Sequence, residues 1–329
     1  MTLFSYIHLS DLHLCQQPLR KNAVSLWGRR WNEVIDTIGE QRKQWGFSSF
    51  FLPASFDPEI AKGVAQFCAD WRDGVDGIII TGDLATTGLA IDIGVAEQFV
   101  KEPAAFAHLT QSRTPTIASL GLPIHLFAGN HDRYVNNGAK PFSNYFDFIF
   151  KDYMDLKTSC VGSWTVEKND RHLAFVHADF SLSMRLGASF PRRAMAYGQG
   201  RVYVDVLDEL RAETLRLRSD VDGVQIVWLI HFAPYECGSS LQLHDHQRLI
   251  DASRALGIKV ILCGHTHEAL VKTVASQTIY CAGSSCCVDN AGGCMVHVVD
   301  FDLDEAIDVT RSTYVWNENQ DEFVFLRSD

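Results

Sequence analysis

The sequence lacks several features that would assign it to a specialised class of protein. No uninterrupted apolar run approaches the roughly 20 residues that a helix needs to cross a bilayer. No internal repeat, low-complexity segment or obvious interdomain linker interrupts the 329 residues. Basic residues are in the minority, 29 Lys and Arg against 40 Asp and Glu, which gives a net charge of −11. The excess of acid argues against general nucleic-acid binding, because affinity for DNA depends on basic groups that neutralise phosphates.

Cysteine is present, but not in a pattern that indicates a metal cluster or a disulfide framework. The nine cysteines form no paired C-x-x-C array, and their number is odd. This scatter is typical of reduced, mostly buried thiols. The adjacent Cys286 and Cys287 are interpreted as core or loop residues, since neighbours on a strand point to opposite faces.

The order of apolar patterns predicts an α/β fold. Hydrophobic residues make up 47% of the chain and charged residues 21%, as expected of a globular protein with a sizeable core. Strands are predicted at 4–9, 75–81, 123–128, 164–167, 172–179, 225–230, 259–263, 270–274, 277–282 and 294–301, with a terminal pair around 317–320. Helices are predicted at 20–45, 58–71, 90–109, 141–155, 202–217 and 245–256.

These elements suggest one domain over residues 1–329, with two packed sheets between helical layers. We expect the strand-rich last third to form the second sheet and to pack against the α/β half. A helical and aromatic segment at about 16–71 is expected to be an insertion.

Polar motifs follow five of the predicted strands. They are Asp11-Leu12-His13, Gly82-Asp83, Gly129-Asn130-His131-Asp132, the single His231, and Gly264-His265-Thr266-His267. Strand ends of an open sheet form the usual rim of an active site. The motifs therefore predict a site that collects carboxylate, carboxamide and imidazole groups.

This set of side chains suits two divalent metal ions. Asp11 and His13 share a two-residue spacing with His265 and His267, which aims both members of a pair to one side if the backbone is extended. Imidazole and carboxylate together favour manganese, iron or zinc. A carboxylate such as Asp83 has two oxygens and can bridge two ions, which hold phosphate and hydroxide when they lie about 3.5–4 Å apart.

Each motif also has an ordinary structural explanation. Gly82-Asp83 is a common turn, His231 alone is typical of a buried structural histidine, and Asp132 suits a helix N-cap or a turn. Two imidazoles at one strand exit are harder to explain by packing. The occurrence of all the motifs in this order favours the metal site.

The order Asp-x-His, Gly-Asp, Gly-Asn-His-Asp, His, Gly-His-x-His resembles the calcineurin-like metallophosphoesterase superfamily. The resemblance implies a two-sheet α/β/β/α sandwich of the metallophosphoesterase type. It implies that His131 faces the substrate and helps to protonate the leaving oxygen. It further implies one ion held by Asp11, His13, Asp83 and His267, and another held by Asp83, Asn130, His231 and His265.

The sequence departs from this pattern in three places. The separation of Asp11 and Asp83 is long for a compact member. The residues 84–88 lack the acidic group that orients the catalytic histidine in some relatives. His231 is followed by Phe232 where a second histidine is also found in the superfamily.

Among subgroups, the motif order most resembles the class III cyclic nucleotide phosphodiesterases, and the segment 180–199 fits their layout. The expected function is therefore dinuclear-metal-dependent hydrolysis of cyclic nucleotides or similar small phosphodiesters. A non-catalytic interaction module on the same fold is disfavoured, because every expected metal ligand and His131 are present. A phospholipid-headgroup phosphodiesterase or phosphatase at a membrane surface is the alternative.

The segment at 16–71 keeps this alternative open. Basic residues beside exposed aromatics would receive a lipid phosphate, whereas a buried aromatic face would indicate an ordinary amphipathic helix. The residues concerned are Arg20, Lys21, Arg29 and Arg30, with Trp27, Trp31, Trp45 and the apolar run 47–52.

The N-terminus shows no basic region followed by a long apolar core. Removal of a leader of about 15–30 residues would also delete Asp11 and His13. We therefore expect a cytoplasmic protein with a small phosphoester substrate. The sequence does not indicate an oligomeric state.

Overall fold

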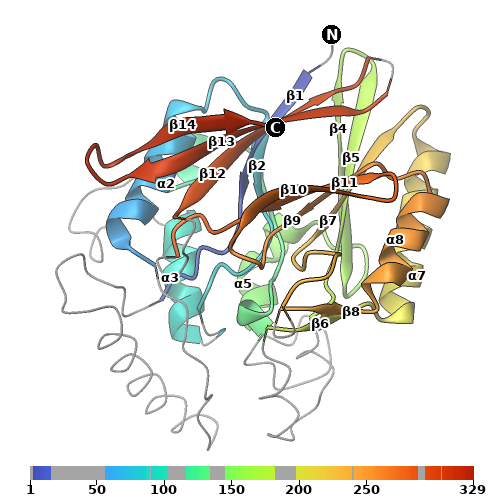
Figure 1. Cartoon of the computed structure of the whole chain (residues 1–329), viewed down its shortest axis with the longest axis horizontal. Coiled ribbons are helices and arrows are strands. Elements are labelled where there is room, and N and C mark those ends of the chain that lie inside the picture. The colour runs from blue at the N-terminus through green and yellow to red at the C-terminus, as the bar shows by residue number, and fades with distance from the viewer. Residues whose placement is uncertain are drawn as a thin grey trace, which may run out of the picture.

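A computed structural model describes residues 3–15, 56–86, 88, 90–101, 116–133, 145–181, 198–238, 241–287, 293–304 and 306–329. Within these ranges the chain forms two six-stranded sheets that pack face to face, with helices on their outer sides (Figure 1). The predicted α/β/β/α sandwich is confirmed.

The first sheet has the strand order β14-β13-β12-β1-β2-β3. Its parallel part consists of β1 (Leu3–Leu9), β2 (Gly77–Ile80) and β3 (Ile124–Leu126). Its antiparallel part consists of β12 (Met295–Asp302), β13 (Asp308–Asn317) and β14 (Glu322–Ser328).

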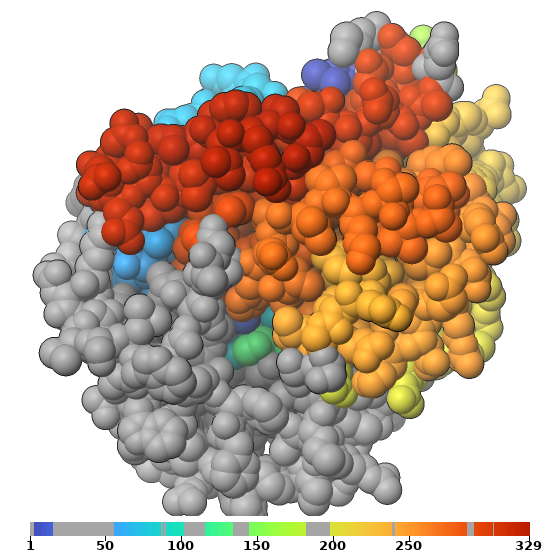
Figure 2. Space-filling view, viewed as in Figure 1, coloured from blue at the N-terminus to red at the C-terminus, as the bar shows by residue number. Residues whose placement is uncertain are grey.

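The expectation that the whole last third would form the second sheet is therefore wrong. β12 pairs with β1 from Leu3–Asp302 to His8–His297, so the last three strands extend the first sheet. The physical reason is that β1 is buried, and its unpaired backbone edge needs a partner strand. Figure 2 shows the result on the surface, where the red C-terminal strands adjoin the orange β10 and β11 of the second sheet.

The second sheet has the order β10-β11-β9-β7-β5-β4. In chain order its strands are β4 (Val161–Lys168), β5 (Arg171–Ala178), β7 (Gln225–Ile230), β9 (Val260–Cys263), β10 (Ala269–Val274) and β11 (Gln277–Ala282). The predicted hairpin at Asn169-Asp170 joins β4 to β5, and both turn residues have positive φ, as a type I′ turn requires. The short strands β6 (Gly200–Arg201) and β8 (Leu243–His244) form a separate parallel pair.

Alternation along the strands divides the interior into three apolar layers. On β1, Phe4 and Tyr6 face the second sheet, while Ile7 and Leu9 face the helices. Tyr6 meets Phe175 of β5 edge to face, with ring centroids 5.0 Å apart. This contact layer fixes the spacing between the two sheets and therefore between their strand ends.

The helices cover the outer faces. The first core includes residues of α2 (Pro58–Asp70), α3 (Ala90–Lys101) and α5 (Tyr145–Met154). The second sheet is covered by α7 (Val204–Asp220) and α8 (His246–Ala255). No helix in the described ranges is both long enough and apolar enough to span a bilayer.

Several predicted elements lie wholly or partly outside the described residues. They include the helix at 20–45, the first part of the 16–71 segment as far as residue 55, and residues 102–109. The predicted helix from Pro58 is confirmed as α2. Its N-cap is Asp57, whose carboxylate accepts the backbone N–H of Glu59 at 2.8 Å.

Candidate metal centre

The predicted site residues follow strands from both sheets. β1, β2 and β3 of the first sheet lead into the loops that carry Asp11, His13, Asp83 and Asn130. β7 and β9 of the second sheet lead into His231, His265 and His267. Because these strand ends lie at the same edge of the sandwich, the loops of both sheets meet there.

One group of side chains gathers around Asp11. The Nε2 atoms of His13 and His267 lie 3.0 Å apart, and His267 Nε2 lies 3.3 Å from Asp11 Oδ1. His13 Nε2 is also 3.9 Å from Asp83 Oδ2. Asp11 and His13 are fully buried, whereas the His267 side chain is 21% exposed. These four residues are the set that the sequence predicts for one ion.

A second group gathers on the other side of Asp83. His231 Nε2 lies 3.1 Å from Asp83 Oδ2 and 2.9 Å from Asn130 Oδ1. His265 Nδ1 lies 3.2 Å from His231 Nε2. The structure thus brings together all seven predicted ligand residues, and Asp83 belongs to both groups.

The unused oxygens of the two carboxylates indicate that a cation fits here. Asp11 Oδ2 accepts the backbone N–H of His265 and Asp83 Oδ1 accepts that of His131, each at 2.8 Å. The second oxygen of each carboxylate is buried and accepts no hydrogen bond from any described residue. Buried carboxylate oxygens are costly unless they are paired or bind a metal. The nitrogen and oxygen donors suit a borderline divalent ion.

The pKa values within this cluster are set by burial and by the charges of neighbouring groups. Burial alone would raise the pKa of Asp83, but the adjacent imidazoles, His231 first, hold it well below its ordinary value. Burial lowers the pKa of His231, but the negative charge of Asp83 raises it more, so that the pKa is about 9. Burial and His231 lower the pKa of His265 to about 3. The opposite shifts of Asp83 and His231 reflect the attraction between the buried carboxylate and the imidazole beside it, and a divalent cation bound there would likewise balance the carboxylate charge.

The backbone at the site differs from the extended conformation that the two-residue spacing predicts. Left-handed φ angles occur at Asp11 (52°), His13 (49°), Asp83 (53°), His265 (71°) and His267 (57°). For residues other than glycine this conformation is uncommon and typically costs about 1–3 kcal/mol. The paired side chains converge because alternate residues are left-handed, which residue spacing alone does not reveal.

Two glycines allow the loops to approach one another. A Cβ on Gly264 would meet Ser10 Oγ and Asp11 Oδ2, and a Cβ on Gly129 would meet Asp83 Oδ1 and its backbone nitrogen. Only a residue without a side chain leaves room for these contacts. The glycines of the motifs are therefore needed to close the site.

Asp132 has a structural role that agrees with its turn interpretation. Its buried carboxylate accepts backbone N–H groups of Gly129 at 2.9 Å, Ala85 at 2.8 Å and Leu84 at 3.2 Å. Burial and the nearby Asp83 raise the pKa of Asp132 to about 7. The residue fastens the loop after β3 to the loop after β2.

His131 lies beside His13, with ring centroids 4.5 Å apart, and is held by a backbone group. Its Nδ1 lies 2.6 Å from the carbonyl oxygen of Thr86, which only accepts, so Nδ1 carries the proton. This contact supplies the orientation that an acidic side chain gives in some relatives. Burial lowers the pKa of His131 to about 4, while Asp83 opposes that shift.

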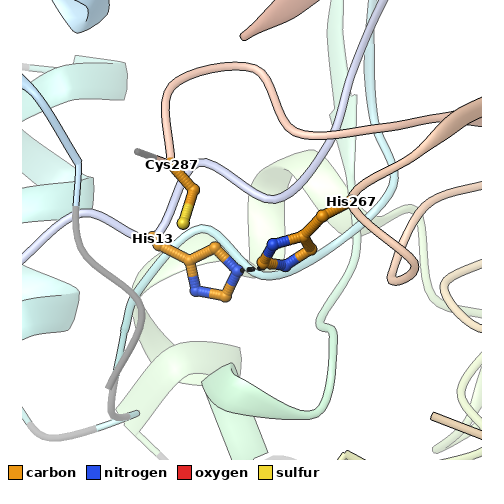
Figure 3. A group of neighbouring side chains, drawn as sticks. All are labelled: His13, His267 and Cys287. Carbon is orange, nitrogen blue, oxygen red and sulfur yellow. Dashed lines mark hydrogen bonds between the residues drawn. The ribbon is translucent and has the colours of Figure 1, made fainter. Parts of the chain in front are cut away.

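Cys287 also lies at this site, which its sequence pattern did not predict. The interpretation as core holds for Cys286, whose sulfur donates to Leu12 O at 3.1 Å. Cys287 faces the other way, toward His13 and His267 (Figure 3). The sequence predicted that the adjacent Cys286 and Cys287 point to opposite faces. It did not show that the face opposite the core is the one that carries His13 and His267.

The fold and these converging donors define a metallophosphoesterase. Residues 4–269 match the calcineurin-like phosphoesterases, and the chain belongs to this family. No curated protein gives a significant match.

Solved structures share the fold at low identity. A dimetal phosphatase from Danio rerio is 11% identical with a TM-score of 0.57, covering 95% of this chain and 96% of its own. GAP50, the anchor in the inner membrane complex of Plasmodium, is 10% identical with a TM-score of 0.54, and the match covers 100% of this chain and 88% of GAP50. A proposed 5′-nucleotidase from Staphylococcus aureus, solved with α-ketoglutarate, is 11% identical with a TM-score of 0.51. The match covers 93% of this chain but only 52% of the Staphylococcus protein, so the chain spans about half its length.

Proposed function

We propose that this chain is a dinuclear-metal-dependent phosphoester hydrolase. Asp83 carries the proposal, because its Oδ2 lies 3.9 Å from His13 Nε2 in one group and 3.1 Å from His231 Nε2 in the other. Asp11, His13 and His267 would complete the first ion site. Asn130, His231 and His265 would complete the second.

The chemistry divides between the metals and His131. Two bound ions would polarise the phosphoester and lower the pKa of an attacking water toward about 7. His131 would hold the leaving oxygen and transfer a proton to it from Nε2, since Nδ1–H is donated to Thr86 O. An anionic phosphoester beside the ring favours its protonated form and so opposes the effect of burial on its pKa.

A small phosphodiester is the proposed substrate, with cyclic nucleotides as the first to test. The order of the motifs supports this choice. The shared fold does not decide it, because a phosphatase and an anchor protein have similar folds at 10–11% identity. The phospholipid alternative depends on the 16–71 segment, of which residues 16–55 lie outside the described ranges.

The remaining assignments are part of the same proposal. Manganese, iron or zinc are the metals that the donor set suits. A single domain over residues 1–329 is supported by the apolar layer that joins the two sheets. A cytoplasmic location is supported by the nine cysteines, all of which lie in described residues and form no disulfide there.

The test is hydrolysis by the manganese-loaded protein of cyclic nucleotides, generic mono- and diesters, nucleic acids and glycerophospholipids. We expect hydrolysis of cyclic or other small diesters that is abolished in Asp83→Asn. Preferential hydrolysis of glycerophospholipids would transfer the proposal to the membrane-surface alternative. Two bound ions without hydrolysis of any phosphoester would contradict the enzymatic assignment.

A further inference from the structure

Cys287 lies in a tightly held turn that leads from β11 toward the metal centre. Its backbone N–H donates to Ser284 Oγ at 3.0 Å, and its carbonyl accepts the Cys294 thiol at 3.3 Å. The residue also forms an isolated antiparallel bridge with Phe56. Its side chain is fully buried. The position of the sulfur is therefore fixed by the backbone rather than by a flexible loop.

The sulfur forms a compact donor group with two proposed metal ligands. One ligand atom each from His13, His267 and Cys287 lies within 4.8 Å of the other two. Figure 3 shows the Cys287 thiol pointing toward the imidazole rings of His13 and His267. Atoms this close together can bind a single ion.

A buried carboxylate oxygen points into the same group. Asp11 Oδ1 lies 3.3 Å from His267 Nε2 and 3.7 Å from His13 Nε2. It is buried and accepts no hydrogen bond from any described residue. This oxygen is an independent sign of a cation beside the sulfur.

We propose that Cys287 is a further ligand of the ion held by Asp11, His13 and His267. This proposal rests on the dinuclear site of the proposed function. Coordination replaces the S–H bond by a sulfur–metal bond and releases the proton to solvent. The sulfur adds a soft donor to a set of nitrogen and oxygen atoms. This position should therefore prefer zinc, iron or cobalt to manganese or magnesium.

The neighbouring cysteines do not share this placement. Cys286 donates to Leu12 O and belongs to the first apolar core. Cys281 donates to Gly264 O at 3.1 Å and contacts Thr266, behind the histidine loop. Cys286 provides the matched control, because it is adjacent in sequence, equally buried and directed away from the ions.

The experiment loads metal-depleted full-length protein with cobalt alone and records its near-ultraviolet absorption and its cobalt content. We expect a sulfur-to-cobalt charge-transfer band in the wild type and in Cys286→Ser. Cys287→Ser should lose the band while it still binds cobalt. Its affinity for zinc should fall by about tenfold or more, and its affinity for manganese should fall less.

A second measurement needs no variant. The zinc-loaded wild type should show a sulfur neighbour about 2.3 Å from zinc in its X-ray absorption spectrum. Two bound cobalt ions with phosphoester hydrolysis, but with neither band nor sulfur neighbour, would overturn the role of Cys287 and leave the proposed function intact. Failure to bind any cobalt or zinc would overturn both.

Discussion

The two sheets contribute different chemistry to the site. The first sheet supplies its oxygen donors through Asp11, Asp83 and Asn130, and one imidazole through His13. The loops after β7 and β9 of the second sheet supply three imidazoles, His231, His265 and His267. Neither sheet alone collects a set that would hold two ions. The site therefore depends on how the sheets pack against each other.

Asp83 is the point at which the two contributions meet. It follows β2 of the first sheet, and its Oδ2 reaches His231 of the second sheet at 3.1 Å. Around it, the loops approach so closely that glycine is required. The oxygen donors thus all follow strands of the first sheet, three of the four imidazoles follow strands of the second, and Asp83 lies between them.

The largest effect is expected when this junction is removed. Asp83→Asn should lose most bound metal and lower turnover by about 10³-fold or more, since a bridging charge acts on both ions. Asn130→Ala should have a smaller effect, because a neutral amide interacts with one ion. Metal content and turnover of purified variants provide the measurement. An equal loss of metal in the two variants would show that Asp83 is not shared.

The next largest effect is expected at His131, which follows β3 of the first sheet and is proposed to transfer a proton without binding metal. His131→Ala should retain both ions and lose about 10²–10⁴-fold in turnover, the usual contribution of general acid catalysis. The loss should be smaller for a nitrophenolate leaving group, which needs little protonation, than for an alkoxide. Metal analysis of the same sample is the control. Loss of an ion would indicate that His131 is itself a ligand, whereas an unchanged rate on alkyl esters would rule out the catalytic role.

A single methyl group should disturb the contact between the sheets. Gly264→Ala places a Cβ against Ser10 Oγ and Asp11 Oδ2, so the loop that carries His265 and His267 must shift. We expect weaker metal binding and about 10²-fold lower turnover, the scale of a small misplacement in an active site. Gly94→Ala is the matched control, because its Cβ meets no atom within 4 Å and alanine favours the helix. Similar activity of the two variants would contradict the close approach.

The smallest effect concerns a histidine of the second sheet that is not a proposed ligand. His177 on β5 lies 2.5 Å from Met154 O through Nε2, and burial lowers its pKa to about 4. Below its unfolded pKa of about 6.5, the unfolded chain binds a proton that the folded protein excludes. Stability is therefore lost as pH falls, by about 2 kcal/mol between about pH 7.5 and about pH 5.

His177→Gln should remove this contribution, so its free energy of unfolding should fall less over the same pH range. Urea unfolding of the wild type and the variant at both pH values measures the difference. An identical loss in the two proteins would show that His177 remains protonated when folded. A smaller loss in the variant would show that His177 is a buried structural histidine that stays neutral in the folded protein.

The sequence predicts the fold, and which polar side chains gather at the strand ends, better than it predicts the local backbone geometry. Strands with polar motifs at their ends are visible in the apolar pattern, as at β2 before Asp83 and β7 before His231. The sheet that β12 joins was predicted wrongly, because pairing with β1 is a long-range backbone contact. The left-handed conformations of Asp11 and His265 and the Thr86 carbonyl that holds His131 are equally invisible, since they depend on the packing of loops. Cys287 was missed for the same reason.

We propose that the donors of the two sheets hold two ions that share Asp83. Anomalous X-ray diffraction from crystals of the manganese-loaded protein would locate these ions. We predict two anomalous peaks on either side of the Asp83 carboxylate, one next to Asp11, His13 and His267 and the other next to Asn130, His231 and His265. A single peak, or two peaks that do not share Asp83, would contradict the account.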